Sequence, residues 1–301
     1  MRVFLTGATG YIGSAVLEAL VRAGHDVTVL VRSSSSVDHL RGRGATGITG
    51  DLSDPAAWRD AAAGFEAYVH TAFEASPRGP DVDRLAVDTF IGLARHAKAV
   101  LLYTSGVWVL GNTRKPAAED APLDPTPIVA YRPAHEHAIL ATTRGGVRAI
   151  VVRPGIVYGG GRGIIGDMLK DADNGLMRII GNGENHWPHV YDRDLGDLYV
   201  RLLGSRTASG IYHANDEADE TVGDIVEAIA AQAPSRPEVR HMPVAEAQRK
   251  LGPYADALAL DQIVRSPRAR ALGWQPTLGS ISRNIPRLFE EWRSARAAAA
   301  H

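Results

Sequence analysis

The chain has 301 residues, of which 45% are hydrophobic and 22% charged, and it carries a net charge of -1 and no cysteine. These values exclude disulfides, thiol nucleophiles and cysteine-ligated metals, and without a basic run they give no sign of a nucleic-acid partner. No apolar run approaches the roughly 20 residues that span a bilayer, so we expect no membrane partner. Because a strand pattern begins at residue 2, we expect no signal peptide. The absence of cysteine fits a cytoplasmic location, which we expect.

The most informative segment is a glycine-rich turn between a strand at 2–5 and a helix, followed by a second strand at 27–31. Its glycines, Gly7, Gly10 and Gly13, are spaced G-x-x-G-x-x-G. The first allows a tight turn, the second lets the backbone approach a pyrophosphate, and the third lets the helix pack closely on the sheet. The helix N-terminus then offers N–H groups to phosphates. The segment predicts a dinucleotide site, and the alternative is a glycine turn without a ligand.

Arg32 ends the second strand and bears on the choice of cofactor. An acidic residue there would bind the ribose 2′-hydroxyl of NAD, whereas an arginine accommodates the 2′-phosphate of NADP. The serines at 33–36 are small hydroxyl donors that can join the phosphate contacts. The sequence therefore favours NADP (NADPH) over NAD. The alternative is a solvated surface arginine followed by a flexible serine loop.

The rest of the first half alternates strand and helix patterns. Strand patterns recur at 47–51, 67–71, 100–104 and 148–153. Helical patterns lie at 12–23 before Gly24, from Asp54 and Pro55 as cap and first turn, from Pro80 to about 97, and from 131 to about 143. This alternation predicts parallel strands with right-handed crossovers, and hence an α/β fold with a Rossmann-type doubly wound parallel sheet.

The second half has a different rhythm, richer in helices. After a glycine-rich stretch at 159–163, helices are expected at 166–172, at 192–203, from a capping box at 221–224 to about 232, and at the end of the chain, with a strand at 210–213. We expect a dinucleotide-binding domain at 1–155, to which 190–215 return. A smaller substrate lobe would comprise 156–189 and 216–301, covering the carboxyl edge of the sheet.

Hydroxyl groups and a histidine form the candidate catalytic set. Thr104 and Ser105 follow a strand, Tyr131 begins a helix, and His135 lies one turn later on the same helix face. Each also has an ordinary structural reading. Tyr131 can be a buried helix-start tyrosine, the two hydroxyls can satisfy backbone groups, and His135 can be an exposed helix residue without a role.

With these residues in view, the chain resembles the extended short-chain dehydrogenase/reductase family, which includes NAD-dependent epimerases and dehydratases and dihydroflavonol-reductase-like enzymes. The motifs that carry the resemblance cover nearly the whole chain: TGATGYIG at 6–13, GDL at 50–52, HTA at 70–72, RPGIVYG at 153–159, HVYDRD at 189–194 and ALGWQP at 271–276.

The resemblance implies a cofactor site and a homodimer. Asp51 and Leu52 would lie beside the adenine, Thr71 and Ala72 along the pyrophosphate and ribose, and Pro154, Gly155 and Val157 against the nicotinamide. Thr9, Tyr11 and Ile12 would complete the glycine turn. Members of the family often pair through the helices that correspond to 80–97 and 131–143.

The resemblance also implies a catalytic serine or threonine, a tyrosine that passes the proton, and a lysine four residues later. This chain departs from that pattern twice. Gly106 stands where many members have a second serine, so Ser105 or Thr104 must supply the hydroxyl, and we favour Ser105. His135 replaces the lysine, and an imidazole loses its charge near neutral pH. Arg132 is a nearby cation, but position i+1 on a helix is expected to point away from Tyr131.

Other candidates are weaker. His135 and His137 do not share a helix face, so we expect no metal site. The loop residues His186 and His189 can touch a ligand or be bystanders. Asp192 and Asp194 resemble an acid/base pair, but Asp192 fits a helix N-cap better. An aromatic wall or core is expected from Trp108, Tyr158 and Trp187.

Three functions therefore stay open. The favoured one is an NADP-dependent oxidoreductase that acts on a small carbonyl or alcohol, or on an imine or enone, with Tyr131 as proton donor. A sugar-nucleotide epimerase or dehydratase would need basic groups such as Arg162, Arg178 and Arg193 for a substrate pyrophosphate. A non-catalytic NADP-binding regulator or sensor would explain the missing lysine.

Overall fold

The computed structural model describes residues 1–113 and 115–299, and these fold into two compact units. Unit 1 comprises Met1–Ser105, Tyr131–Arg153 and Leu195–Tyr212. Unit 2 comprises the described residues of Gly106–Ala130, Pro154–Asp194 and His213–His301.

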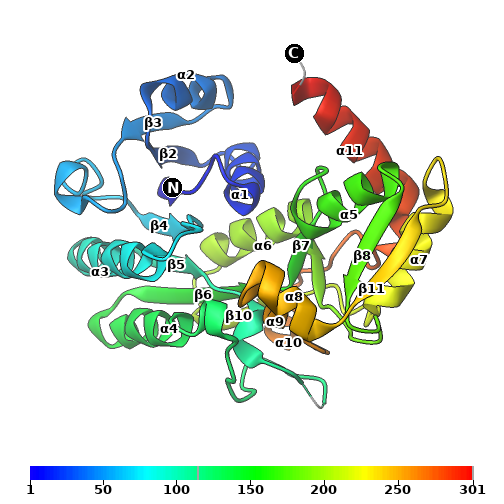
Figure 1. Cartoon of the computed structure of the whole chain (residues 1–301). Coiled ribbons are helices and arrows are strands. Elements are labelled where there is room, and N and C mark those ends of the chain that lie inside the picture. The colour runs from blue at the N-terminus through cyan, green and yellow to red at the C-terminus, as the bar shows by residue number, and fades with distance from the viewer. Residues whose placement is uncertain (114, 300–301) are drawn as a thin grey trace. The chain divides into compact units, whose positions relative to one another are not determined.

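A seven-stranded sheet, which lies mostly in unit 1, has the strand order β10-β6-β5-β4-β1-β2-β3 (Figure 1). The strands are β1 (Arg2–Thr6), β2 (Asp26–Val31), β3 (Thr46–Thr49), β4 (Ala67–His70), β5 (Val100–Thr104), β6 (Arg148–Pro154) and β10 (Gly210–Ala214). The register of β1, β2, β3, β4, β5 and β6 is parallel at each described pairing. Leu5, for example, is opposite Val29 on one side and Val69 on the other. The predicted doubly wound sheet is confirmed.

Helices cover both faces of this sheet. They are α1 (Tyr11–Arg22), α2 (Ser34–Gly42), α3 (Gly79–Ala97), α4 (Arg132–Leu140) and α6 (Asp192–Gly204). Figure 1 shows α3 and α4 on one face and α1 and α6 on the other. The α1–α6 approach is close, because a Cβ on Gly196 would lie 2.8 Å from the carbonyl oxygen of Ala15.

An aromatic cluster fills the core beneath α3. Phe4 on β1 stacks on Trp58 with ring centroids 5.9 Å apart and meets Phe65 edge-on at 5.3 Å. Tyr68 on β4 and Phe90 on α3 complete the cluster. Each such ring pair contributes about 0.5–1.5 kcal/mol beyond the area that it buries. The cluster thereby fixes α3 on the strands that carry the site.

One local expectation was only partly right. Asp54 is the N-cap residue and Pro55 stands in the first turn, but the element is a three-residue 3-10 turn, η1 (Pro55–Ala57), and the Asp54 side chain makes no capping hydrogen bond. The alternative reading of the serines after Arg32 as a flexible loop is wrong, because Ser34 begins α2 and Ser33 is its N-cap residue. The other 3-10 turns are η2 (Val107–Leu110), η3 (Pro127–Val129), η4 (Ala141–Gly145) and η5 (Ser282–Asn284).

Unit 2 holds two small parallel sheets that the sequence patterns did not predict. One pairs β7 (Ile156–Tyr158) with β9 (His189–Tyr191), and the other pairs β8 (Leu176–Ile180) with β11 (Glu238–Met242). The helices are α5 (Gly163–Asp173), α7 (Val222–Gln232), α8 (Val244–Leu251), α9 (Tyr254–Leu258), α10 (Pro267–Ala271) and α11 (Ile285–Ala299). The capping box predicted at the start of α7 is confirmed, because Thr221 and Asp224 bond to each other's backbone N–H.

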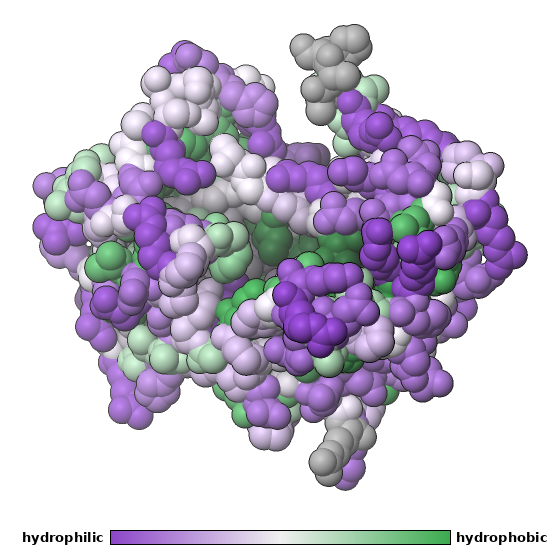
Figure 2. All heavy atoms as spheres, in the orientation of Figure 1, coloured by the Kyte–Doolittle hydropathy of each residue, from purple (hydrophilic) through white to green (hydrophobic). Residues whose placement is uncertain are grey.

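Hydrophilic residues cover most of the surface that Figure 2 presents. Among the described residues, Met1, Phe73, Leu123 and Leu251 are the exposed large hydrophobic side chains. None of the described helices is both long and apolar enough to cross a membrane.

Candidate functional site

The glycine turn is shaped by contacts that exclude larger side chains. Gly7 has a φ of 83°, and a Cβ there would lie 2.6 Å from the backbone nitrogen of Ala72. A Cβ on Gly13 would lie 2.1 Å from the carbonyl oxygen of Gly7 and 2.5 Å from Oγ1 of Thr71. No side chain caps the start of α1 at Gly10, which is exposed together with Thr9. These residues fit a phosphate group at an uncapped helix end.

The strand β4 ends against this turn. Oγ1 of Thr71 donates a 2.7 Å hydrogen bond to the carbonyl oxygen of Thr6, the residue before Gly7. The structure therefore brings Thr71 and Ala72 together with the glycine turn, as a shared pyrophosphate site requires.

Arg32 is exposed at the end of β2 and lies near Asp51. Hydrogen bonds from Ser53 hold the pKa of Asp51 below its usual range, and the positive charges of Arg78 and Arg32 lower it further. Arg32 and the serines at the start of α2 thus present one cation and several hydroxyl groups to solvent. Leu52, next to Asp51, is half-buried.

The two hydroxyl groups at the end of β5 differ in their partners. Thr104 Oγ1 lies 2.6 Å from the hydroxyl of Tyr199 on α6. Ser105 is 3% exposed, and among the described residues nothing bonds to its Oγ. Because buried hydroxyl groups are ordinarily paired, Ser105 is the one available for a ligand.

Arg132 does not point away from Tyr131, so this expectation was wrong. Its Nε donates a 3.4 Å hydrogen bond to the hydroxyl of Tyr131, and its guanidinium carbon lies 5.9 Å from that ring and 5.9 Å from the ring of Phe73. A long side chain can turn back along the first turn of a helix, which the direction of its Cβ alone does not describe.

His135 is buried, which rules out the exposed-residue reading. Its ring meets Tyr131 edge-on with centroids 5.2 Å apart. Nδ1 of His135 bonds to Oδ2 of Asp83 at 2.7 Å. The expected shared helix face is therefore present, and Asp83 on α3 is an unexpected partner.

Asp83 accepts two more hydrogen bonds. Nε2 of His70 donates to its Oδ1 at 2.9 Å, and the hydroxyl of Tyr103 donates to its Oδ2 at 2.7 Å. Burial raises the pKa of Asp83, but the hydrogen bonds from His135 and His70 outweigh it and hold this pKa well below its usual range. Burial and the charge of Asp83 raise the pKa of Tyr103 well above 10, so its phenol stays a donor.

The residues expected at the nicotinamide lie in unit 2. Pro154, Gly155 and Val157 are buried. A Cβ on Gly155 would lie 2.5 Å from the carbonyl oxygen of Pro188, so glycine is needed for this close packing.

The weaker candidates mostly have structural roles. The carboxylate of Asp194 accepts hydrogen bonds from the backbone and hydroxyl of Thr277, and Asp192 begins α6. His186 pairs with Asp261 at the surface. Nδ1 of the fully buried His189 lies 3.6 Å from Oδ1 of Asp216.

The expected aromatic residues separate into two groups. Tyr158 and Trp187 belong to the buried core of unit 2. Trp108 is half-buried and meets Tyr254 edge-on at 6.0 Å. Arg162, Arg178 and Arg193 are all exposed.

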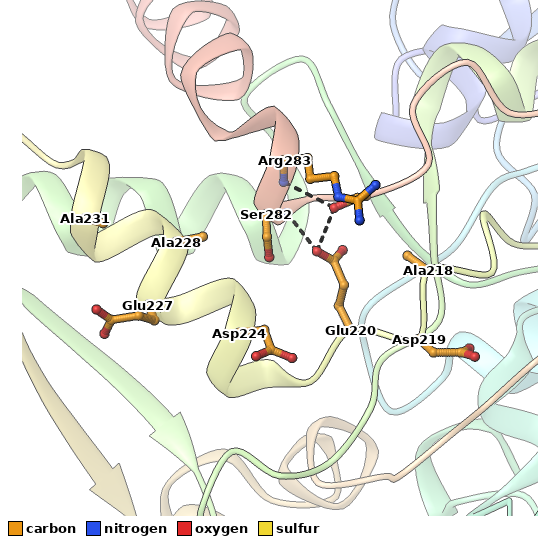
Figure 3. A pocket seen from close by; sticks show the side chains of 10 residues that line it. Ala218, Asp219, Glu220, Asp224, Glu227, Ala228, Ala231, Ser282 and Arg283 are labelled. Atoms are coloured by element: carbon orange, nitrogen blue, oxygen red, sulfur yellow. Dashed lines mark hydrogen bonds between the residues drawn. The ribbon is translucent and has the colours of Figure 1, made fainter.

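An open cavity of about 530 Å³ lies in unit 2 (Figure 3). It is lined by Asp219, Glu220, Asp224, Glu227 and Arg283, among others, and by none of the residues predicted for cofactor or catalysis. Ser280 and the backbone of 281–282 bind the carboxylate of Glu220, so this acidic group anchors a turn.

Comparisons with known proteins give a family match and several relatives. The NAD dependent epimerase/dehydratase family matches residues 3–214. An uncharacterized protein, C2A9.02 of Schizosaccharomyces pombe, is 31% identical over 95% of this chain and 98% of its own. The 2-alkyl-3-oxoalkanoate reductase of Stenotrophomonas maltophilia is 28% identical over 64% of this chain and 62% of its own.

Solved structures agree on the fold. The UDP-glucose 4-epimerase of Thermus thermophilus, in complex with NAD, has a TM-score of 0.83 at 23% identity, over 98% of this chain and 100% of its own. The human epimerase family protein SDR39U1, with NADPH, has a TM-score of 0.72 at 22% identity, over 96% of this chain and 99% of its own.

Proposed function

Because the chain belongs to the NAD-dependent epimerase/dehydratase family, we propose that it is an NADP-dependent oxidoreductase of small molecules. The substrate would be a carbonyl or alcohol, or an imine or enone of similar size. A relative named as a reductase and a structural neighbour that holds NADPH support this choice. So does Arg32, which suits a 2′-phosphate.

One observation carries the proposal: the unpartnered hydroxyl of Ser105 and the Tyr131–Arg132 pair belong to the same unit as the glycine turn. A carbonyl reduction needs a donor to hold the substrate oxygen and an acid to protonate it. Ser105 and Tyr131 are the matching groups, and Thr104 is already engaged with Tyr199.

The residues present fit a dinucleotide. Gly7, Gly10 and Gly13 form a turn without room for a side chain at two of the three positions, next to an uncapped helix. Arg32 would bind the 2′-phosphate, and Asp51 would lie beside the adenine ring. Pro154, Gly155 and Val157 remain the proposed neighbours of the nicotinamide.

In the direction of reduction, the carbonyl carbon would receive the hydride that a nicotinamide cofactor supplies when bound. Ser105 donates a hydrogen bond to the carbonyl oxygen. Tyr131 transfers its phenolic proton to that oxygen, which completes the alcohol. Arg132 faces the resulting phenolate, which regains its proton from solvent.

The first test is calorimetric titration with NADPH and NADH. We expect tighter binding of NADPH, and a loss of about tenfold or more in the Arg32→Asp variant, because a charge-assisted phosphate contact is removed. Arg41→Asp, an exposed arginine on α2, is the matched control. Equal affinity for both cofactors in the unchanged protein would contradict the NADP preference.

The second test is NADPH oxidation over a panel of carbonyl and imine compounds. Tyr131→Phe should abolish turnover and leave NADPH binding intact. Turnover that survives in Tyr131→Phe would remove this residue as the proton donor. Release of bound NAD from the purified protein, with conversion of a UDP-sugar and no added cofactor, would favour the epimerase instead.

A further inference from the structure

Asp83 joins four secondary-structure elements through one carboxylate. It lies on α3, and its two oxygens accept from His70 at the end of β4, Tyr103 on β5 and His135 on α4, at 2.9, 2.7 and 2.7 Å. Its side chain is 11% exposed. The low pKa that these donors produce keeps it ionised, so it can only accept hydrogen bonds.

An obligate acceptor determines where the proton of His135 lies. Because Asp83 cannot donate, Nδ1 of His135 must carry the hydrogen of the 2.7 Å bond. A neutral imidazole then has its lone pair on Nε2. Among the residues that the structure describes, nothing bonds to Nε2, so this atom is available to accept from a hydroxyl group.

The same carboxylate is linked to the glycine turn. Nε2 of His70 donates to Asp83, and Nδ1 of the same ring lies 2.6 Å from the hydroxyl oxygen of Thr6. Thr6 directly precedes Gly7. One buried network of hydrogen bonds therefore runs from the turn expected to hold the pyrophosphate to His135, beside Tyr131.

We propose that Asp83 is a positioning residue that holds His135 in the Nδ1–H form, so that its Nε2 accepts a hydrogen bond from a sugar hydroxyl of the nicotinamide nucleotide. This inference rests on the proposed function. Without a fixed acceptor at Nδ1, a neutral imidazole exchanges its proton between both ring nitrogens. The carboxylate of Asp83 removes that freedom.

The test reads the tautomer directly. In protein labelled with 15N-histidine and held above pH 8, long-range 1H–15N correlation spectra distinguish the Nδ1–H and Nε2–H forms. His135→Gln identifies the signal of His135 among the 11 histidines. We expect Nδ1–H in the unchanged protein and a shift to Nε2–H, or a mixture, in Asp83→Asn.

Asp88→Asn is the matched control, because Asp88 is an exposed residue of the same helix that pairs with Arg84. It should leave the tautomer unchanged. In calorimetry, Asp83→Asn should weaken NADPH binding by about tenfold or more, while Asp88→Asn should not.

An Nε2–H signal for His135 in the unchanged protein would overturn the inference, and so would an unaltered tautomer in Asp83→Asn. If Asp83→Asn does not fold, Tyr103→Phe keeps the carboxylate and must keep the Nδ1–H form. Since the spectra need neither cofactor nor substrate, a failure to turn over any carbonyl would count against the proposed function alone.

Discussion

Arg132 places a permanent charge at the hydroxyl of Tyr131, although the two residues are adjacent in the chain. Burial opposes the charge of Arg132, but Tyr103, Tyr131 and Asp83 outweigh this effect and raise its pKa. The ring of Phe73 adds a second contact to the guanidinium. The cation is therefore held in place and stays charged throughout the pH range of an assay.

We expect Arg132→Gln to lower kcat for NADPH-dependent reduction by about tenfold or more, because a charged hydrogen bond to the proton donor is lost. Arg132→Lys should retain most of the activity, since its ammonium keeps the charge. Steady-state kinetics measure both variants against Arg84→Gln, an exposed arginine on α3. Full activity of Arg132→Gln would contradict this role.

At the residue level, the sequence predicted single positions better than it predicted their partners. The glycine spacing and the i+4 relation of Tyr131 and His135 follow from regular geometry. Asp83 lies 52 positions from His135, and no local sequence pattern predicts a contact between residues so far apart in the chain. The orientation of Arg132 was predicted wrongly, because a long side chain can turn back from the direction in which its Cβ points.

The elements β6 and α4 are joined by a buried ion pair. Arg153 on β6 donates to Glu136 from Nε, at 3.0 and 3.2 Å from the two carboxylate oxygens, and from Nη2 to Oε2, and both side chains are at most 3% exposed. Such a pair is bidentate and shielded from solvent, so the loss of either partner leaves the other as an unpaired buried charge. It fixes α4, which carries His135 and begins directly after Tyr131, to the sheet.

We expect Glu136→Ala to lower the free energy of unfolding by about 3–5 kcal/mol, because Arg153 is left as an uncompensated buried charge. Urea denaturation gives this value. Glu18→Ala is the control, since its pairing with Arg22 is exposed and should contribute about 0–1 kcal/mol. Equal midpoints for the two variants would refute the structural importance of the pair.

Whole elements were predictable where they repeat a regular period. The strands of the main sheet and the helices α1, α3 and α7 follow from apolar spacing and caps. The two small sheets of unit 2 do not, because β7 and β9 have three residues each and pair with partners more than 30 residues away. Strands this short contain too few residues to display alternation.

At the scale of the whole molecule, we expect a homodimer through α3 and α4. Gly92 on α3 is exposed, and a Cβ there would meet no atom within 4 Å. Gly92→Arg should therefore fold as a single chain but obstruct the pairing of two. Gly42→Arg on α2 is the control, because Gly42 is equally open.

Light scattering coupled to size-exclusion chromatography gives the masses. The unchanged protein and Gly42→Arg should elute at the mass of two 32.2 kDa chains, and Gly92→Arg at the mass of one. A mass of one chain for the unchanged protein would reject the homodimer.

The aromatic cluster around Phe4 has an optical consequence. The chain has five tryptophans, and Trp58 is the one that lies in unit 1, whereas Trp108, Trp187, Trp274 and Trp292 belong to unit 2. In Trp58→Phe, the ring that stacks on Phe4 is replaced by another aromatic ring, and all remaining indole fluorescence comes from unit 2. The difference between the emission of the two proteins during denaturation therefore reports the unfolding of unit 1 by itself.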